Sequence, residues 1–464
     1  MLNSRAKRIR ILVTGASGFI GSRLVARLST SSLDPLISNE PEVVCMTRNV
    51  ESLNRHYNEN VKVIKADVMN YQELINVMNG IDVAFYLIHS MEGSSKDWEK
   101  FAEKDRLAAE NFATAATECG IKRIIYLGGL SPKKGEEGEL SEHLLSRNEV
   151  GKILKKSSAK VTIFRAAVIL GQGGGSFEML RYLVERLPIM ICPKWVLTTS
   201  QPIAVDDVIT YLAKSVVIDD TEGRTFDIGG SDLLTYMDMM RGYAKMINKS
   251  IRILIIPFLT PRLSSYWVDL ITPVRASLAR PLIDSLKHEA IVTDDSIKKI
   301  IPIKLRNFEE AITAAVKEDR QIHIQKPRVV RNGRTSRSLN NKFLIIFLFA
   351  LAAVGSTFYL LNSRPEIFQI RWLVLTGLWY IGIMISLYFV FKESKLGALT
   401  AGIVGWVTLA FWLADIIYTV SGHSLISNSP NLVITIRNII GPVIAAVVVA
   451  ASHNIFHKMR VREF

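Results

Sequence analysis

The sequence predicts an α/β domain, with a doubly wound parallel sheet and a small substrate lobe, followed by an all-α domain of four transmembrane helices. Three observations lead to this prediction. Apolar, strand-like runs alternate with helix-like segments up to about Val316. A glycine-rich turn follows the first of these runs and opens a helix. From Phe343 onward, long apolar runs with very few charges dominate the chain.

Strands and helices alternate along the first two-thirds of the chain. Strands are expected at residues 9–14, 42–47, 61–65, 82–88, 123–127 and 161–165, with helices at 22–28, 71–78, 98–119 and 142–155. This alternation gives a parallel sheet with helices on both faces. Residues 1–320 are expected to form this domain. Within it, segment 224–316 is more mixed, with a late strand and two amphipathic helices, and is expected to be the substrate lobe.

The first strand breaks into a turn with glycines at every third position, Gly15, Gly18 and Gly21. Gly15 permits the turn, Gly18 lets the backbone approach a pyrophosphate, and Gly21 allows close packing of the helix. The N–H groups at the helix start supply an anion site. An ordinary glycine-rich turn is the alternative, but a dinucleotide is preferred because the run both follows a strand and opens a helix. The residues assigned to this cradle are Gly15, Ser17, Gly18, Phe19, Ile20 and Gly21.

This turn and several later landmarks resemble the extended and atypical short-chain dehydrogenase/reductase superfamily, including its epimerase/dehydratase and NmrA-like branches. The landmarks are segments 14–21, 66–68, 85–89, 124–129, 165–171 and 202–208, and the resemblance covers residues 8 to 317. It implies a Rossmann domain that binds NAD(P). It also implies that Asp67 and Val68 contact adenine, and that Leu87, Ile88 and His89 lie under the cofactor. For Asp67, a turn or helix-capping role is the alternative.

The end of the second strand bears on the choice of cofactor. An acidic residue there would bind the ribose 2′-hydroxyl of NAD, whereas an arginine suits the extra phosphate of NADP through its charge and forked donors. Arg48 stands at this position and favours NADP, with NAD still open. The alternative is a solvated arginine at the start of a loop.

The catalytic positions depart from the family pattern. The family sets a tyrosine as proton donor and a lysine four residues later, and this chain has His143 and Arg147 at those places. The spacing still puts both side chains on one helix face. Histidine can donate or accept a proton near neutrality, whereas arginine can bind a ribose or phosphate but cannot shuttle a proton. Gly129 replaces the family's serine, and Ser131 is a displaced substitute.

Three functions follow from these positions. The preferred one is an oxidoreductase that transfers a hydride between NADP(H) and a hydrophobic, membrane-associated substrate, with His143 as acid or base and Arg147 gripping the cofactor or an anionic group. The second is a non-catalytic dinucleotide-binding subunit or redox sensor of a membrane complex, in which the site has lost proton transfer. For His143 by itself, a solvated helix histidine is the alternative. A nucleotide-sugar epimerase or dehydratase comes third, because the tyrosine and lysine are missing.

Two further segments bear on the substrate. The glycine run at 171–177 is expected to be a substrate lid, with a long turn as the alternative. The apolar segment 251–273 is interrupted by prolines and charges too often for a spanning helix. It is expected to be core, with the wall of an apolar substrate pocket as the alternative.

The charge and the cysteines of the chain limit the kinds of partner and ligand that are expected. The net charge is +14, but the most concentrated basic run lies directly before the first apolar run, so anionic lipid is expected rather than nucleic acid. The three cysteines, Cys45, Cys119 and Cys192, are far apart and lack metal-ligand spacing. A reducing compartment and no metal site are therefore expected, and a homo-oligomer or a membrane complex stays open.

The C-terminal third is expected to be a multi-pass domain of the cell membrane. A linker at 321–342 carries Lys326, Arg328, Arg331, Arg334, Arg337 and Lys342, and domain 343–464 has apolar runs at 343–361, 372–391, 396–420 and 432–452. By the positive-inside rule, the dehydrogenase-like domain and the C-terminus are cytoplasmic. Asp415 and Arg437 fall at similar depth and are expected to form a structural ion pair, with a proton or substrate path as the alternative.

Overall fold

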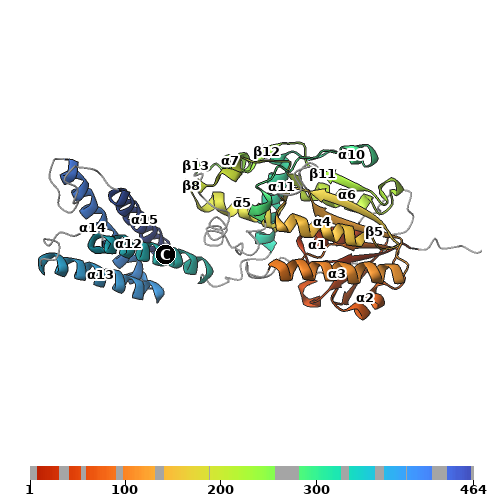
Figure 1. The fold of residues 1–464 in the computed structure, drawn as a ribbon, viewed down its shortest axis with the longest axis horizontal. Helices are drawn as coiled ribbons and strands as arrows, with labels where there is room; N and C mark the ends of the chain where they lie inside the picture. The colour runs from red at the N-terminus through yellow and green to blue at the C-terminus, as the bar shows by residue number, and fades with distance from the viewer. Residues whose placement is uncertain are drawn as a thin grey trace, which may run out of the picture. The chain divides into compact units, whose positions relative to one another are not determined.

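The structure is a computed structural model, which describes residues 8–30, 41–53, 59–89, 98–130, 140–187, 189–255, 282–325, 334–360, 370–392, 394–420 and 436–460. The chain divides into two compact units, Met1–Gln325 and Lys326–Phe464. Each unit is described by itself below, and Figure 1 labels the elements of both.

A seven-stranded parallel sheet forms the centre of the first unit. Its strands are β1 (Arg10–Thr14), β2 (Glu42–Thr47), β3 (Val61–Lys65), β4 (Val83–Tyr86), β5 (Arg123–Gly129), β6 (Lys160–Ala166) and β11 (Thr225–Ile228), in the spatial order β11-β6-β5-β4-β1-β2-β3. The predicted doubly wound parallel sheet is confirmed. The strand order reverses between β1 and β4, and in open α/β sheets ligands bind outside the carboxyl ends of the strands at such a point.

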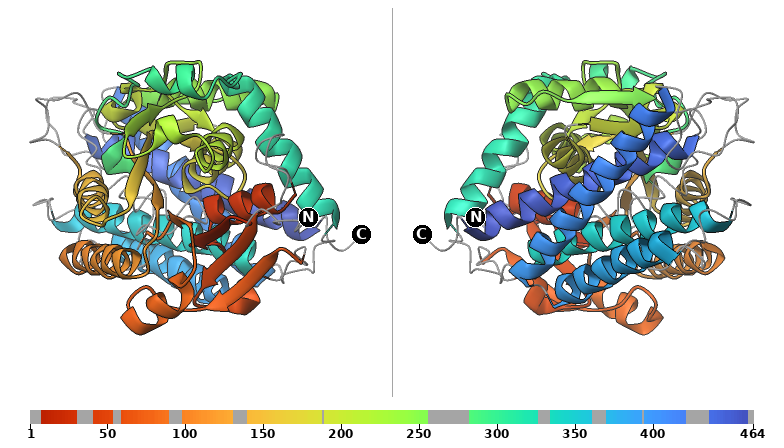
Figure 2. Two further views of the ribbon diagram at one scale, coloured as in Figure 1. Left: turned by 90° about the vertical axis from the view of Figure 1, so that its right-hand side faces the viewer. Right: turned by 90° about the vertical axis from the view of Figure 1, so that its left-hand side faces the viewer.

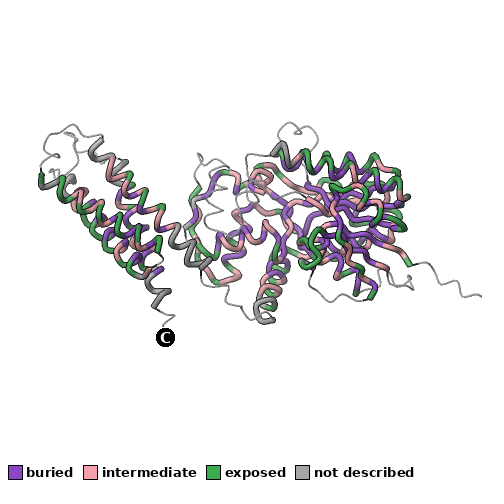
Figure 3. Tube along the Cα trace, turned by 90° about the horizontal axis from the view of Figure 1, so that it is seen from below, coloured by how far each residue is buried: buried purple, intermediate pink, exposed green. Residues whose placement is uncertain are grey.

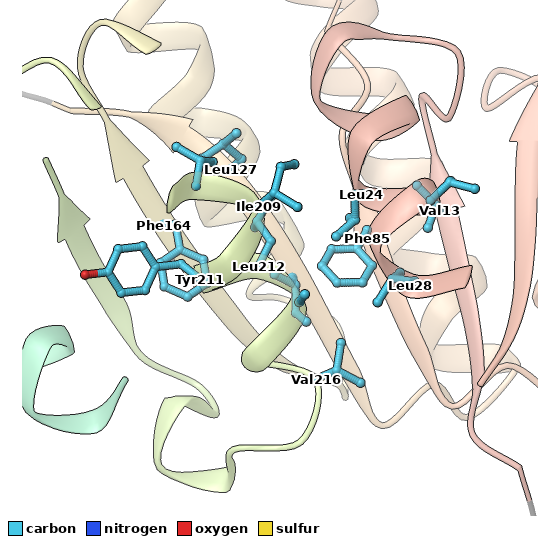
Figure 4. Close-up of a cluster of buried hydrophobic side chains, with 14 of the residues drawn as sticks. Val13, Leu24, Leu28, Phe85, Leu127, Phe164, Ile209, Tyr211, Leu212 and Val216 are labelled. Atoms are coloured by element: carbon cyan, nitrogen blue, oxygen red, sulfur yellow. The ribbon is translucent and has the colours of Figure 1, made fainter. Parts of the chain in front are cut away.

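Helices cover both faces of this sheet, as the two views of Figure 2 show. They are α1 (Phe19–Thr30) and α6 (Val205–Lys214) on one face, and α2 (Tyr71–Met78), α3 (Trp98–Glu118) and α4 (Glu142–Leu154) on the other. Neighbouring residues of β1 face opposite ways, because Ile11 and Val13 belong to the first apolar core and Leu12 to the second. In Figure 4, Phe85 of β4 points toward α1. Figure 3 shows the buried residues gathered in the interior of the first unit.

Several element bounds differ from the sequence prediction. β4 ends at Tyr86 rather than at residue 88. Helix α1 begins at Phe19 rather than at residue 22, because the glycine turn runs directly into the helix: the Ser22 N–H donates to the Gly18 carbonyl at 3.0 Å. The last helix of the unit, α11 (Phe308–Gln325), continues nine residues beyond the predicted end at residue 316.

A smaller lobe is built from short strand pairs and helices. The pairs are β7 (Ile169–Leu170) with β10 (Ile203–Ala204), β8 (Ile189–Cys192) with β13 (Arg252–Ile255), and β9 (Thr199–Ser200) with β12 (Leu234–Thr235), and the helices include α5 (Gly175–Arg186) and α7 (Tyr236–Met246). The short helix α10 (Ser296–Ile300) packs instead against β11 of the central sheet. The predicted lobe boundary at residue 224 is therefore wrong. β11 belongs to the central sheet, while α5, β8 and β9 precede the predicted segment.

The apolar segment 251–273 is described only at its start. Leu254 and Ile255 of β13 are 55% and 39% exposed, so these two side chains are not core. Residues 256–281 lie outside the described part of the chain.

The second unit is helical, with α12 (Arg334–Leu360), α13 (Ile370–Phe391), α14 (Lys395–Val420) and α15 (Ile436–Arg460). Two helices contain apolar stretches long enough to cross a membrane, Leu373–Phe391 and Leu396–Ile417, and the other two contain shorter ones, Phe343–Ser356 and Ile440–His453. Four spans therefore stay a prediction. Both ends of the expected linker at 321–342 are helical, because α11 reaches Gln325 and α12 begins at Arg334.

The predicted charge pair of the second unit is only half described. Asp415 of α14 is fully buried. The side chain of Arg437, near the start of α15, lies outside the described part.

Candidate active site

The glycine turn between β1 and α1 has no room for side chains at two positions. Gly15 has a φ of +64°, and a Cβ added there would lie 2.7 Å from the Leu87 carbonyl oxygen. A Cβ added to Gly21 would lie 2.2 Å from the Gly15 carbonyl oxygen. The Gly18 N–H donates to that same oxygen at 2.9 Å. The turn is thus a tight backbone loop that leads straight into α1.

This loop fits the diphosphate of a dinucleotide. Ser17 and Gly18 are exposed, and Phe19 and Ile20 are half-buried. The first N–H groups of a helix have no partner within the helix, and the first turn of α1 carries no acidic residue. Arg48 is exposed just past the end of β2, the strand next to β1 in the sheet. A cation there lies one strand away from the phosphate loop.

Asp67 and Val68 follow β3 and form a local turn. The Asp67 carboxylate accepts the Met69 N–H at 3.0 Å, and the Asp67 N–H donates to Glu73 at 2.7 Å. Asn70, not Asp67, caps α2. Val68 is buried. The alternative role of Asp67 as a turn residue therefore has a geometric basis, and its contact with adenine stays a prediction.

Thr14 ties the end of β4 to the glycine turn. Its hydroxyl donates to the Phe85 carbonyl at 2.8 Å and accepts the Leu87 N–H at 3.1 Å. Leu87, Ile88 and His89, predicted to lie under a cofactor, are half-buried beyond this point. The strand end is thereby fixed beside the phosphate loop.

A chain of polar side chains that leads into the interior starts at the half-buried His89. Its Nδ1 lies 3.1 Å from an Asp105 carboxylate oxygen, and its Nε2 lies 3.2 Å from His143 Nδ1. The two imidazole ring centres are 4.8 Å apart. Ser146 donates to the same Asp105 oxygen at 3.4 Å. The loop after β4, α3 and α4 thus bring together three residues that are distant in sequence.

His143 is only 7% exposed, so the alternative of a solvated helix histidine is wrong. His143 and His89 stand out in the sequence, whereas Asp105 and the contact between the two rings do not. One signal was available for Asp105: it precedes Ala108, Ala109 and Phe112 at helical spacing, and all three are buried. An acid on the apolar stripe of a helix needs a buried partner.

The burial of both histidines favours their neutral forms. Burial lowers the pKa of His89, although the hydrogen bond to Asp105 acts in the opposite direction. Burial lowers the pKa of His143 well below its ordinary value, and the charges of His89 and Arg147 lower it further. Both rings are therefore neutral around pH 7. Within the described residues, Nε2 of His143 has no hydrogen-bond partner.

Arg147 is anchored to β5. Its guanidinium donates to the Leu127 carbonyl and lies 5.5 Å from the centre of the Tyr126 ring, while its own carbonyl accepts the Tyr126 hydroxyl at 3.0 Å. The predicted grip of Arg147 on a cofactor or substrate stays a prediction. What the structure adds is a positive charge near both histidines.

The position of the family's serine is closed by packing. A Cβ added to Gly129 would lie 2.6 Å from a methyl carbon of Leu144 on α4. This close approach of α4 to the end of β5 explains why Gly129 carries no side chain. Ser131, the predicted substitute, lies outside the described residues.

The glycine run after β7 packs on the phosphate loop. Added Cβ atoms on Gly171 and Gly174 would lie 3.2 Å and 2.8 Å from the Phe19 ring. Arg23 of α1 donates to the Gln172 carbonyl at 2.8 Å. These contacts hold the run against α1, and its role as a lid stays a prediction.

A cleft of about 810 Å³ lies elsewhere, between α1, α6 and α11. Arg23, Ile209 and Ala315 are among the residues that line it. None of the residues predicted for cofactor binding or catalysis does. We therefore build the candidate site on the glycine turn and the histidine pair.

A family model matches part of the first unit. Residues 11–149 are similar to the NAD dependent epimerase/dehydratase family. The fold of the first unit is of the Rossmann type, with its parallel sheet and the helices on both faces. The matched segment runs from the glycine turn through the helix that carries His143.

Two curated relatives match a similar length. The Auxiliary protein GraX of Staphylococcus aureus is 27% identical over 128 residues, which are 26% of this chain and 36% of that protein. Cinnamoyl-CoA reductase 1 of Petunia hybrida is 28% identical over 127 residues, which are 26% of this chain and 35% of that protein. The chain thus spans about a third of the length of these relatives.

Solved structures agree on the fold. UDP-glucuronic acid 4-epimerase from Bacillus cereus, in complex with NAD, aligns with a TM-score of 0.51 at 16% identity and covers 68% of this chain and 100% of its own. The Citrobacter sp. triphenylmethane reductase, complexed with NADP(H), aligns with a TM-score of 0.52 at 18% identity and covers 66% of this chain and 99% of its own. At these identities the likeness concerns the fold alone.

Proposed function

We propose that this protein is an NAD(P)-dependent oxidoreductase in which His143 transfers the proton that accompanies a hydride. The observation that carries the proposal is the 3.2 Å contact of His143 with His89, at the sheet edge that also holds the glycine turn. When bound, NAD(P) supplies or accepts the hydride. In oxidation of an alcohol, the substrate oxygen would give its proton to Nε2 of His143 while the carbon gives up a hydride. In reduction of a carbonyl, His143 would first take up a proton at Nε2 and then pass it to the substrate oxygen.

The residues present fit the cofactor. The N–H groups of the loop from Gly15 to Gly21 would bind its diphosphate, since no acidic residue lies in the first turn of α1. Arg48 would bind a 2′-phosphate, which makes NADP the proposed form. Of the two solved structures described above, the epimerase was obtained with NAD and the reductase with NADP(H). The choice between NAD and NADP therefore rests on Arg48.

We propose a hydrophobic substrate that resides in the membrane, such as a quinone, an isoprenoid precursor or a lipid. The second unit has two helices with apolar stretches long enough to cross a membrane. Apolar side chains on them, such as Leu378 at 60% and Trp406 at 61%, are exposed, as lipid-facing residues would be. A cytoplasmic first unit and contacts of the basic linker residues with anionic headgroups belong to the same proposal.

The second candidate is a non-catalytic, dinucleotide-binding subunit or sensor of a membrane complex. It is favoured by the similarity to a protein whose name calls it auxiliary. A nucleotide-sugar epimerase or dehydratase is third. It is favoured by the matching family model and opposed by the histidine and arginine at positions 143 and 147.

The test is binding of NADPH and NADH to the purified full chain, followed by cofactor fluorescence. Wild type is compared with Arg48→Glu, His143→Ala and the control Arg241→Glu, which reverses the charge of an exposed arginine on α7. Tight NADPH binding that only Arg48→Glu weakens, together with slow NADPH oxidation that needs His143, supports the oxidoreductase. Binding without turnover in any variant supports the subunit, and no binding of either nucleotide refutes both.

A further inference from the structure

We propose that Asp105 and His89 are positioning residues that hold His143 with its Nε2 as a bare proton acceptor and then take over the positive charge that His143 would acquire. This inference deepens the proposed function, on which its chemical meaning rests. It concerns how these three residues arrange their protons, and that arrangement can be measured without a substrate.

The order of the protons follows from the contacts. An ionised carboxylate can only accept, so His89 Nδ1 must carry the proton shared with Asp105 at 3.1 Å. A neutral imidazole has one donor and one acceptor nitrogen, so His89 Nε2 accepts. His143 Nδ1, 3.2 Å away, must then donate, which leaves its Nε2 without a proton.

The hydrogen bonds from Asp105 through His89 to His143 form a relay, and the Asp105 carboxylate is its buried end. Asp105 is 5% exposed, and the oxygen that faces His89 also accepts a hydrogen bond from Ser146. A donor on the carboxylate favours its ionised form. The carboxylate therefore stays an acceptor and sets the direction of every donor behind it.

The same geometry tells where an incoming proton ends. In oxidation of an alcohol, the O–H bond of the substrate would break and its proton would go to Nε2 of His143, and bound NAD(P) would supply the acceptor for the hydride that leaves the carbon. The Nδ1 proton of His143 can pass to Nε2 of His89. The positive charge then lies beside the Asp105 carboxylate, which counters the lowering of the His89 pKa by burial, rather than on His143, whose pKa burial lowers well below its ordinary value. In its resting state, the site is therefore arranged for Nε2 of His143 to take a proton from the substrate.

The substitution Asp105→Asn separates the positioning role from a merely structural one, which would leave the tautomer of His143 unchanged. In Asp105→Asn, the amide can donate to His89 Nδ1, which turns His89 Nε2 into a donor and His143 Nδ1 into an acceptor. The Nε2 of His143 then carries the proton. The shape of the site is kept, but the direction of the relay is reversed, as in a serine-protease triad whose aspartate becomes asparagine.

The experiment reads the tautomers directly. The full chain, labelled with ¹⁵N-histidine and placed in lipid bilayers, is studied by solid-state NMR at pH 8 without nucleotide. The chain has eight histidines, and His89→Gln and His143→Gln assign the two relevant sets of signals. Glu110→Gln, which removes an exposed carboxylate from the same helix α3, is the matched control.

We expect the Nδ1–H tautomer for both histidines in wild type and in Glu110→Gln, and a switch of His143 to Nε2–H in Asp105→Asn. An Nε2–H tautomer of His143 in wild type overturns the proposal. So does an unchanged His143 tautomer in an Asp105→Asn protein that keeps the wild-type melting temperature. Because no cofactor is present, these results are independent of NADPH turnover. If Asp105→Asn does not fold, the wild-type tautomers decide alone.

Discussion

Restoring the family's serine at position 129 should disturb the protein rather than improve it. The Cβ of Gly129→Ser would lie 2.6 Å from the Leu144 side chain, well inside van der Waals contact. Leu144 is 6% exposed and sits between His143 and Arg147 on α4, so it has little space to move away. Overpacking of this kind costs about 1–3 kcal/mol.

The cost converts into a melting temperature. An unfolding entropy of about 2.1 cal/mol/K per residue gives roughly 1.5 °C per kcal/mol for a unit of about 300 residues. Gly129→Ser should therefore lower the melting temperature of the first unit by about 2–5 °C, measured by intrinsic fluorescence. It should also slow NADPH oxidation, because α4 carries His143.

A double-mutant cycle isolates the contact. Leu144→Ala alone should destabilise the unit by about 2–5 kcal/mol, since it leaves a cavity. In that background, Gly129→Ser should cost at least about 1 kcal/mol less than in wild type, because the serine fills the vacated space. A Gly129→Ser protein that melts like wild type, or equal costs in both backgrounds, would refute the packing explanation.

Four further outcomes are expected. Gly21→Ala should abolish nucleotide binding in the fluorescence titration, because its Cβ would lie 2.2 Å from the Gly15 carbonyl oxygen. Arg48→Glu should weaken NADPH binding by about 10-fold or more and NADH binding far less, as expected for the loss of a charge-assisted hydrogen bond worth roughly 1.5–3 kcal/mol; equal losses would argue against a 2′-phosphate contact. Asp105→Asn should lower the rate of NADPH oxidation by roughly 10²–10⁴ while the dissociation constant of NADPH stays within a few-fold, and an unchanged rate would exclude a catalytic relay. The folded-state pKa of His143 lies below the ordinary value of 6.5, so the stability that the neutral ring contributes is present above that pH and is lost as the pH falls. The melting temperature of His143→Gln should therefore fall less steeply than that of wild type between pH 6.5 and 5. Parallel curves of melting temperature against pH would contradict the burial of a neutral ring.

The local patterns of the sequence are enough to place the main elements. The bounds of β2, β3 and α2 agree with the prediction to the residue, because alternating or helically spaced apolar residues and a capping asparagine act over short distances. The glycine spacing likewise predicts the phosphate loop, since Gly15 and Gly21 meet within one turn. Element ends were less well predicted where a neighbour decides them, as at the end of β4 and the continuation of α11.

In the second unit, too, the sequence predicts some features and leaves others open. Hydropathy placed its four helices, because a long apolar run is a local property of the chain. How many of them cross a membrane is not decided by that property alone, since two of the four contain an apolar stretch of sufficient length within the residues that the structure describes.

The sequence by itself determined the sheet, the phosphate loop and the candidacy of His143. Only the tertiary structure joined His143 to His89 across 54 positions and His89 to Asp105 across 16, closed position 129 with Leu144, and turned Arg147 toward the Leu127 carbonyl. The physical reason is that a proton's place on an imidazole depends on which partner its other nitrogen meets in a water-poor interior. That meeting is set by how α3 and α4 pack against the ends of β4 and β5, and no local pattern encodes it.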